Sequence, residues 1–413
     1  MTPQSTFPGT HARPLARCVW LALLMLGLSG CAGWIESNIP EEPAPAPPPA
    51  EPFVLNRFQI DAGTEVIGRL RYTRVRGEET LLDIARAYDL GYDEIVSANP
   101  GVDPWTPDAG ERVLLPSAHV LPDAPRAGVV INLAARRLFY YPPAPKGAPR
   151  TVITHPIGIG REGWSTPLGR TQVANKRAAP PWTVPPSIRR EHAARGDPLP
   201  AVLPAGPDNP LGSHALRLGW SSILIHGTNK PAGIGMRVSH GCIQLYPEDI
   251  APLFAAVPVG TPVTVVDQPY LAGIGPDGLV LEAHTSATAA GSKAGAAVVK
   301  QVIEAAQARQ RPVDRVAVDL ERAQASASRR AGYPLPIAVG APDAAHYLAE
   351  APAAPLLSAP DPAPLPADGD WYVDLGTFKS ELGARRLTAM LAHQGPPIPA
   401  RRLAQGRQYQ VLA

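Results

Sequence analysis

The sequence predicts a mainly β domain, built from two packed sheets with one main helix, and two smaller α/β modules that flank it. Three observations support this fold class. Between residues 126 and 267, β-rich segments alternate with turns rich in glycine and proline, and one clear helical segment interrupts them. Residues 72–116 read as strand, helix, helix, strand, and residues 371–412 read as strand, helix, strand.

Composition supports several modules joined by linkers. The chain has 413 residues, of which 51 are proline, and this length exceeds one ordinary domain. The net charge is +2 without a long Lys/Arg block, which argues against nucleic acid as a partner. Residues 161–237 nevertheless carry ten Lys/Arg against four acids. This local excess favours a substrate with carboxylates, although a solvated basic face would give the same pattern.

The N-terminus reads as a targeting segment, predicted over residues 1–30. Arg13 and Arg17 precede an apolar run over residues 19–28, which is too short for a spanning helix. The following Leu28-Ser29-Gly30-Cys31 resembles a bacterial lipobox. That resemblance implies removal of the signal before Cys31, acyl chains on this cysteine, and a periplasmic protein anchored to the inner leaflet of the outer membrane. A plain secretory signal is the alternative.

Residues 31–68 are predicted to form a tether, because residues 40–52 are dense in proline and alanine. Residues 69–118 are predicted to form the first module. Its first helix has Leu81, Ile84, Ala85 and Tyr88 on one face. The strand, helix, helix, strand order resembles a LysM domain, which implies binding to glycan chains of peptidoglycan; a folded spacer without sugar affinity is the alternative.

The central domain is predicted over residues 126–267. Residues 129–133 and 137–141 form a hairpin signal, and the helix is expected at residues 247–257, with proline and two acids in its first turn. Further strands are expected at residues 151–154, 171–174, 221–225 and 262–266.

Cys242 is the candidate nucleophile. Cys18 lies in the targeting segment and Cys31 directly after it, where a lipoprotein signal would be cut, so Cys242 would be the one free thiol of an exported chain. A free thiol in an oxidising compartment indicates chemical use, although a small buried hydrophobe is the alternative. Two imidazoles are near in sequence, His226 at the end of a strand and His240 two residues before the cysteine.

His226 is favoured over His240 as the general base, since a separate strand lets its ring approach the sulfur freely. The other ring nitrogen of His226 needs an acceptor, and a backbone carbonyl such as that of Gly227 is the candidate. Gly241 lets the chain pass close under a substrate, and main-chain amides near Cys242 are candidates for binding an oxyanion.

The motif resembles the signature of YkuD-type L,D-transpeptidases. The resemblance extends over about residues 127–267 and is carried by these segments: Pro156-Ile157-Gly158-Ile159-Gly160-Arg161-Glu162-Gly163-Trp164, Thr166-Pro167-Leu168-Gly169, residues 192–200, Ile225-His226-Gly227-Thr228-Asn229, and Met236-Arg237-Val238-Ser239-His240-Gly241-Cys242-Ile243.

The resemblance implies an acyl transfer on peptidoglycan without a metal or cofactor. The cysteine attacks the bond between diaminopimelate and the fourth-position D-alanine, releases D-alanine and becomes acylated. An amine then resolves the acyl-enzyme: either a second stem's diaminopimelate, giving a 3-3 crosslink, or the terminal lysine of an outer-membrane lipoprotein. By position, Cys242 is the nucleophile and His226 the proton acceptor, and Ser239, His240 and Gly241 shape the site.

Gln244 departs from the pattern, because relatives with a lipoprotein signal and a LysM module usually have arginine two residues after the cysteine. Positions 242 and 244 of an extended segment face the same side. Glutamine lacks the forked charge that holds a carboxylate. We therefore expect lower activity than in an arginine-bearing relative.

Residues 268–368 are predicted to be an alanine- and proline-rich region with two helices, at residues 296–308 and 313–327, and a linker from residue 351. Residues 369–413 resemble the first part of a SPOR domain, which implies binding to peptidoglycan without stem peptides. The match stops before that family's second helix and last strand.

Two other functions remain open at this stage. The first is a catalytically weakened wall-binding scaffold, consistent with Gln244 and two glycan-binding modules. The second is a zinc-dependent wall hydrolase with His226, His240 and Cys242 as ligands, although the chain has no HExxH motif to supply a general base.

Overall fold

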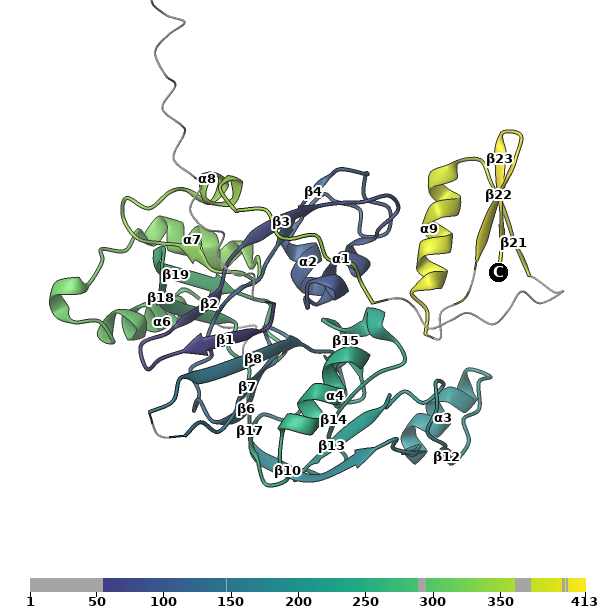
Figure 1. Ribbon diagram of the computed structural model, residues 1–413, viewed down its shortest axis with the longest axis horizontal. Coiled ribbons are helices and arrows are strands. Elements are labelled where there is room, and N and C mark those ends of the chain that lie inside the picture. Colours follow the sequence, from purple (N-terminus) through teal and green to yellow (C-terminus); the bar gives the residue numbers. More distant parts are fainter. Residues whose placement is uncertain (1–54, 146, 289–294, 361–372, 396–397, 399) are drawn as a thin grey trace, which may run out of the picture. The chain divides into compact units, whose positions relative to one another are not determined.

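The computed structural model describes residues 55–145, 147–288, 295–360, 373–395, 398 and 400–413 (Figure 1). The predicted signal peptide, Cys31 and the proline-rich stretch of residues 40–52 lie outside the described residues. Among the helices of the described part, none has the length and apolarity needed to span a bilayer.

A nine-stranded sheet is the framework around the predicted motif. The hairpin expected from the sequence is present, with Ile131 opposite Leu138 in antiparallel strands. The strands expected near residues 151, 171 and 262 are also present. In spatial order the sheet contains β1 (Arg57–Ile60), β8 (Arg150–Pro156), β7 (Arg137–Tyr141), β6 (Gly128–Asn132), β17 (Pro262–Val266), β10 (Gly169–Ala178), β13 (His214–Leu218), β14 (Leu224–His226) and β16 (Ile243–Gln244).

The expected pair of separate sheets is not what the structure shows, because one strand joins the two halves. Residues 169–172 of β10 pair with β17, and residues 173–178 pair with β13. The register shifts between Val173 and Asn175, and such an irregularity bends a strand. Residues from both halves, Ile131 and Ile225 among them, then share one hydrophobic core.

The expected helix is confirmed as α4 (Pro247–Ala256), which packs against β13 (Figure 1). Its first position is proline and its first turn holds Glu248 and Asp249, where carboxylates interact favourably with the unpaired amides. Ile250 and Leu253 are buried on its inner face. This helix therefore covers the part of the sheet that carries the motif.

A second helix in this region, α3 (Pro186–Ala194), was missed by the sequence analysis. It begins with proline at its first position, yet Ile188 is its one buried residue. A helix with so narrow an apolar face gives little periodic signal. The short strands β11 (Trp182–Thr183) and β12 (Val202–Leu203) pair on either side of it.

The strand, helix, helix, strand order predicted for the first module is confirmed. β3 (Arg71–Arg74) pairs antiparallel with β4 (Arg112–Leu115), and α1 (Leu81–Ala87) and α2 (Tyr92–Ala98) connect them. The Thr80 side chain accepts a hydrogen bond from the Asp83 amide, and the Asp83 carboxylate accepts one from the Thr80 amide. This capping box fixes where α1 starts. Leu81, Ile84, Ala85 and Tyr88 are all buried, as their shared face predicted.

The predicted tether ends earlier than expected. Residues 57–60 form β1, which pairs antiparallel with β8 at the edge of the large sheet. β2 (Val66–Gly68), which precedes the strands of the first module in sequence, pairs with β5 (Ala118–Val120), which follows them. β1 alternates polar and apolar residues over only four positions and β2 has two adjacent apolar residues, so both short strands depend on partners distant in sequence.

The region predicted as helices and linker contains a folded sheet. β18 (Tyr270–Gly275) and β19 (Gly278–Ala283) form a hairpin, and β20 (Leu335–Pro336) pairs with β19. α6 (Ala296–Ala308) has the predicted bounds, whereas α7 (Leu320–Arg329) starts later than predicted. Figure 1 shows α6 and α7 beside this sheet, and their apolar faces share a core with it. The α8 helix (Ala344–Ala349) follows.

The first residues of the predicted linker form backbone hydrogen bonds with the first module. The Tyr72 amide donates to the carbonyl of Pro352, and the Ala354 amide donates to the carbonyl of Tyr72, at 3.0 and 2.8 Å. The Tyr88 hydroxyl donates to the carbonyl of Pro355 at 2.7 Å. Prolines occur here because an edge segment does not need every amide for pairing.

The C-terminal region has a three-stranded sheet with one helix. The predicted strand and helix are present as β21 (Asp374–Phe378) and α9 (Glu381–Ala392), and the predicted last strand as β23 (Gln408–Leu412). A further strand, β22 (Arg401–Gln405), was not expected from the sequence and pairs with β23 across a tight turn. α9 lies against these strands (Figure 1).

A buried ion pair joins the first module to the large sheet. Arg137 of β7 donates to both carboxylate oxygens of Glu94 in α2, at 2.9 and 3.0 Å, and these side chains are 2% and 6% exposed. Arg137 also donates to the carbonyl of Asp89 at 2.9 Å. Nearby, the Tyr246 hydroxyl donates to the carbonyl of Leu90 at 2.9 Å. These bonds fix the position of the first module on the sheet.

Removing one charge of this pair is predicted to destabilise the protein strongly. Glu94→Gln removes the carboxylate that accepts two bonds from the buried guanidinium of Arg137, so the free energy of unfolding should fall by about 3 kcal/mol or more. Urea unfolding monitored by circular dichroism measures it. The control is Glu304→Gln, which breaks a 3.7 Å pair with Lys300 whose side chains are 73% and 62% exposed; its effect should stay within about 0.5 kcal/mol. Equal effects would contradict the assignment.

Candidate active site

The two predicted catalytic side chains emerge from neighbouring strands on one face. β14 runs parallel to β16 with Ile225 opposite Ile243, and both isoleucines are 0% exposed. Because side chains alternate along a strand, His226 and Cys242, each one position away, face the other side. Both line a cavity of about 1210 Å³. The structure therefore brings these two residues to one site.

His226 has a defined tautomer. Its Nδ1 lies 2.6 Å from the carbonyl oxygen of Gly227, and because a carbonyl only accepts, Nδ1 carries the proton and Nε2 keeps its lone pair. This is the acceptor that the sequence suggested. Burial lowers the pKa of His226 to about 4, although the bonds to backbone carbonyls oppose the shift. At neutral pH the ring is therefore an uncharged base.

Cys242 is half-buried, and its thiol donates to the carbonyl oxygen of Ser222 at 3.5 Å. Burial raises the pKa of the Cys242 thiol above its usual value. A raised thiol pKa and a lowered imidazole pKa both favour the neutral pair. The resting site thus holds a neutral thiol and a neutral imidazole.

The turn before the cysteine is held by Ser239 and Gly241. The Ser239 hydroxyl donates to the Cys242 carbonyl at 2.6 Å, and the Gly241 amide donates to Ser239 Oγ at 3.2 Å. Gly241 has φ +101°, a conformation that favours glycine. Thr166 Oγ1 donates to the Gly241 carbonyl at 2.9 Å. Both polar groups of the Gly241 backbone are therefore engaged, and its role is to shape the turn.

His240 is held by an ion pair that the sequence analysis did not find. Glu191 of α3 accepts two bonds from Arg161 Nη2, both 2.7 Å long. His240 Nε2 lies 3.1 Å from Glu191 Oε2 and 2.9 Å from Arg161 Nη2. Hydrogen bonds from Arg161 and His240 lower the pKa of Glu191 to about 2. The Trp164 and His240 rings pack in a T-shaped arrangement, with centroids 4.9 Å apart.

These contacts leave His226 as the better candidate base, since Nε2 of His240 is already occupied. Arg161 and Trp164 stand in segments that carry the family resemblance, but Glu191 had no sequence signal because it lies on the polar helix α3.

Gln244 lies where the extended-strand argument placed it, in the lining of the same cavity. Its backbone exchanges two hydrogen bonds with Gly158, both 2.9 Å long. A methyl group on Gly158 would lie 3.0 Å from Gln244 Oε1, so the amide group of the glutamine lies over the backbone of that glycine.

The cavity walls carry more positive than negative side chains. Lys176, Arg177, Arg217 and Lys230 are part of the lining, against two aspartates, Asp197 and Asp208. The local basic excess noted in the sequence is thus partly directed into the cavity.

The proposed zinc set does not assemble. Within the residues that the structure describes, His226, His240 and Cys242 do not form a group whose ligand atoms lie within 4.8 Å of one another. Among the described residues, ligand atoms that do lie within 4.8 Å of one another belong to a different group, Asp89, His155 and Asp249.

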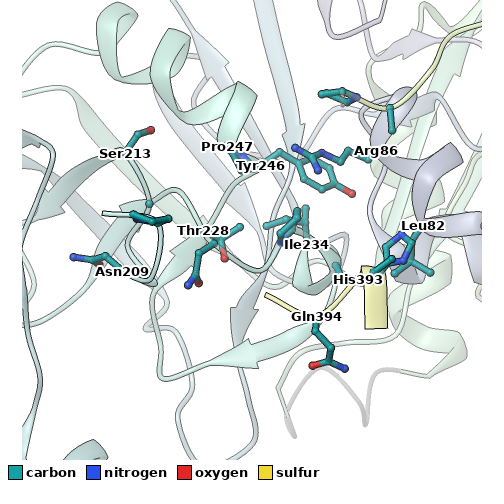
Figure 2. A pocket seen from close by; sticks show the side chains of 18 of the residues that line it. Leu82, Arg86, Asn209, Ser213, Thr228, Ile234, Tyr246, Pro247, His393 and Gln394 are labelled. Carbon is teal, nitrogen blue, oxygen red and sulfur yellow. The ribbon is translucent and has the colours of Figure 1, made fainter. Parts of the chain in front are cut away.

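A second cavity of about 640 Å³ lies apart from the thiol. Figure 2 shows Arg86 of α1 near Tyr246 and Pro247 on one side of it, and Thr228 and Asn209 on another. The Arg86 guanidinium carbon is 5.8 Å from the centre of the Tyr246 ring. Neither Cys242 nor His226 lines this cavity.

Comparison with known proteins identifies two families in the chain. The family model described as L,D-transpeptidase catalytic domain matches residues 126–265, and the SPOR domain model matches residues 367–413.

Three curated proteins of Escherichia coli strain K12 are similar over longer stretches. Probable L,D-transpeptidase YcfS is 44% identical over 229 residues, which are 54% of this chain and 70% of that protein. Probable L,D-transpeptidase ErfK/SrfK is 41% identical over 284 residues, or 67% of this chain and 89% of that protein. Probable L,D-transpeptidase YbiS is 49% identical over 195 residues, or 47% and 62%.

The resting protonation state predicts how Cys242 reacts with a simple alkylating agent. Because burial raises the thiol pKa above its ordinary 9.0, alkylation by iodoacetamide should accelerate with pH through about pH 9 without a plateau between about pH 5 and 8. Peptide mapping by mass spectrometry follows modification of this residue, with N-acetylcysteine as the reference thiol. A plateau below about pH 7 would instead indicate a preformed thiolate and imidazolium pair.

Proposed function

The chain belongs to the L,D-transpeptidase family, and from this premise we propose that Cys242 and His226 perform a cysteine acyl transfer on stem peptides of peptidoglycan. One observation carries the proposal: the Cys242 thiol and the His226 imidazole, whose Nδ1 is bonded to a backbone carbonyl, line the same cavity. The family membership explains why the motif recurs with a mainly β, sheet-rich scaffold.

The proposed reaction has two steps. In the first, Cys242 Sγ attacks the carbonyl carbon that joins diaminopimelate to D-alanine, while its proton passes to His226 Nε2. The proton then moves to the nitrogen of the departing D-alanine, the C–N bond breaks and a thioester remains. In the second, an amine attacks the thioester, His226 accepts the amine proton, and that proton returns to the sulfur as the new amide forms.

The positive side chains of the cavity suit this substrate class. Both diaminopimelate and the terminal D-alanine carry carboxylates, and Arg217 and Lys230 in the lining provide donors of matching charge. Opposite charges concentrated in a cleft raise the local concentration of such a substrate.

Replacing the nucleophile or the base is predicted to abolish turnover. Cys242→Ser should lower D-alanine release from tetrapeptide-bearing wall fragments below detection, and His226→Ala should lower it by about 10²- to 10⁴-fold. Mass spectrometry of the products measures both, and circular dichroism verifies folding. Ser213→Ala, on the wall of the second cavity and not of the first, serves as the matched control and should keep full activity. Normal turnover in either site variant would refute the assignment.

The acceptor, the anchoring and the location are part of the proposal. The acceptor amine is a second stem's diaminopimelate or the terminal lysine of an outer-membrane lipoprotein, and product analysis in the presence of each distinguishes them. We place the protein in the periplasm, anchored by acyl chains on Cys31, on the basis of the lipobox-like residues 28–31. The SPOR domain and the LysM-like first module would hold it against the glycan strands.

Introducing the charge that Gln244 lacks is predicted to increase activity. Gln244 faces the cavity, and Gln244→Arg adds a forked cation able to bind a substrate carboxylate, which should raise kcat/KM by about tenfold. Gln244→Met, which fills similar volume without hydrogen-bonding groups, is the control and should not raise it. An unchanged or reduced rate in the arginine variant would contradict a role for charge here.

The weakened-scaffold alternative is tested by acylation rather than by turnover. A carbapenem is expected to form a covalent adduct with Cys242, detectable by mass spectrometry of the intact chain. A properly folded protein that forms no adduct would favour a scaffold role.

A further inference from the structure

A buried group of two carboxylates and one imidazole lies between the first module and the large sheet. Asp89 follows α1, His155 lies on β8 and Asp249 lies in the first turn of α4; the three residues are 5%, 4% and 9% exposed. Their ligand atoms all lie within 4.8 Å of one another. None of them takes part in the transpeptidase site described above.

The distances match those between ligands of one metal ion. His155 Nδ1 is 3.3 Å from Asp89 Oδ2 and 3.3 Å from Asp249 Oδ1. Two ligand atoms bound to tetrahedral zinc, each about 2.0–2.1 Å from the ion, are separated by about 3.3–3.4 Å. A well-formed hydrogen bond between an imidazole and a carboxylate would be shorter, at about 2.7–2.9 Å.

The same atoms lack other partners. Both carboxylate oxygens of Asp89, His155 Nδ1 and Asp249 Oδ2 are buried without a hydrogen bond. The Asn56 side chain also interacts with Asp89, without a well-formed hydrogen bond to either carboxylate oxygen. Buried polar atoms normally have partners, so the group has room for a ligand that satisfies several oxygens and a nitrogen at once.

Charge balance points to a cation. The arginines that interact electrostatically with the group are Arg137 and Arg86, and each already bonds both oxygens of a glutamate, Glu94 and Glu248 respectively. Two buried carboxylates therefore remain against a single imidazole. A divalent cation would match their charge, and a buried charge without compensation is costly.

The backbone at Asp89 supports a role for its side chain. Asp89 has φ +52° directly after a helix, where glycine is the usual residue. An aspartate at this position costs conformational energy, which a bond made by its carboxylate would offset.

We propose that Asp89, His155 and Asp249 bind one divalent transition-metal ion, zinc by the chemistry of the ligands, which fastens the first module to the catalytic domain. One nitrogen and two carboxylates suit zinc, and the second oxygen of Asp89 offers a fourth ligand atom. The site is structural, because its residues lie outside the cavity that holds Cys242. The inference does not depend on the proposed function.

Metal content tests the proposal in a chain without thiols. The untagged full-length chain with Cys18, Cys31 and Cys242 replaced by serine is treated with chelator, equilibrated with zinc, freed of unbound metal and analysed by mass spectrometry for metals. We expect about one equivalent of zinc per chain, and substitution with Co²⁺ should give the visible absorption of a tetrahedral nitrogen and oxygen site. Asp249→Asn should lose both signals.

The matched control is Asp197→Asn, which makes the same chemical change beside His192, at a 3.0 Å contact in an exposed position; it should keep the full equivalent. Absence of stoichiometric zinc, or equal uptake by the Asp249→Asn variant, would overturn the proposal and leave a proton as the bridge between the three groups. Should Asp249→Asn fail to fold, the parent chain decides: zinc added after chelation should raise its Tm by several degrees, and an unchanged Tm overturns the proposal.

Discussion

The active-site geometry depends on one strand pairing, the parallel contact of β14 with β16. Ile225 and Ile243 are opposite each other and fully buried, so the hydrophobic core fixes the register of two very short strands. A slip of either strand by one residue would turn its own candidate catalytic side chain into the core and its isoleucine into the cavity. The energy of burying these isoleucines is therefore also what keeps the sulfur and the imidazole on one face.

Burial affects charge differently at the cavity and at the contact between the first module and the large sheet. At the cavity it disfavours charge on both Cys242 and His226, so the proposed reaction would start from an uncharged pair. Under the first module, burial surrounds Arg137 with the carboxylates of Glu94 and Asp89 and leaves charges that only specific partners can satisfy. Such layers favour one arrangement of modules over others more than they add net stability.

Around the motif, roles divide between groups that react and groups that hold them. Ser239 and Thr166 bond the turn before the thiol, and Arg161 and Glu191 hold His240. None of these four side chains needs to change its protonation state in the proposed reaction. Gln244 lies in the lining of the cavity and carries no charge. It is therefore the position where the difference from arginine-bearing relatives bears most directly on the proposed reaction.

The sequence by itself determined what consecutive residues encode. The sequence determined four features that depend on local patterns of a few residues: the capping box at Thr80, the helix that starts at Pro247, the hairpin around residues 133–136, and Cys242 near two histidines. The sequence also contains a turn signal for the hairpin of β18 and β19, which was not predicted: Gly275-Pro276-Asp277-Gly278 lies between two apolar runs.

Only the tertiary structure decided which distant residues meet. The contact of Glu191 with His240 spans 49 positions, and that of Asp89 with His155 spans 66. The joining of two expected sheets through β10, and the pairing of residues 352–354 with Tyr72, likewise depend on register and packing. Propensity and periodicity describe one segment at a time, whereas these contacts arise when whole segments compete to bury the same surface.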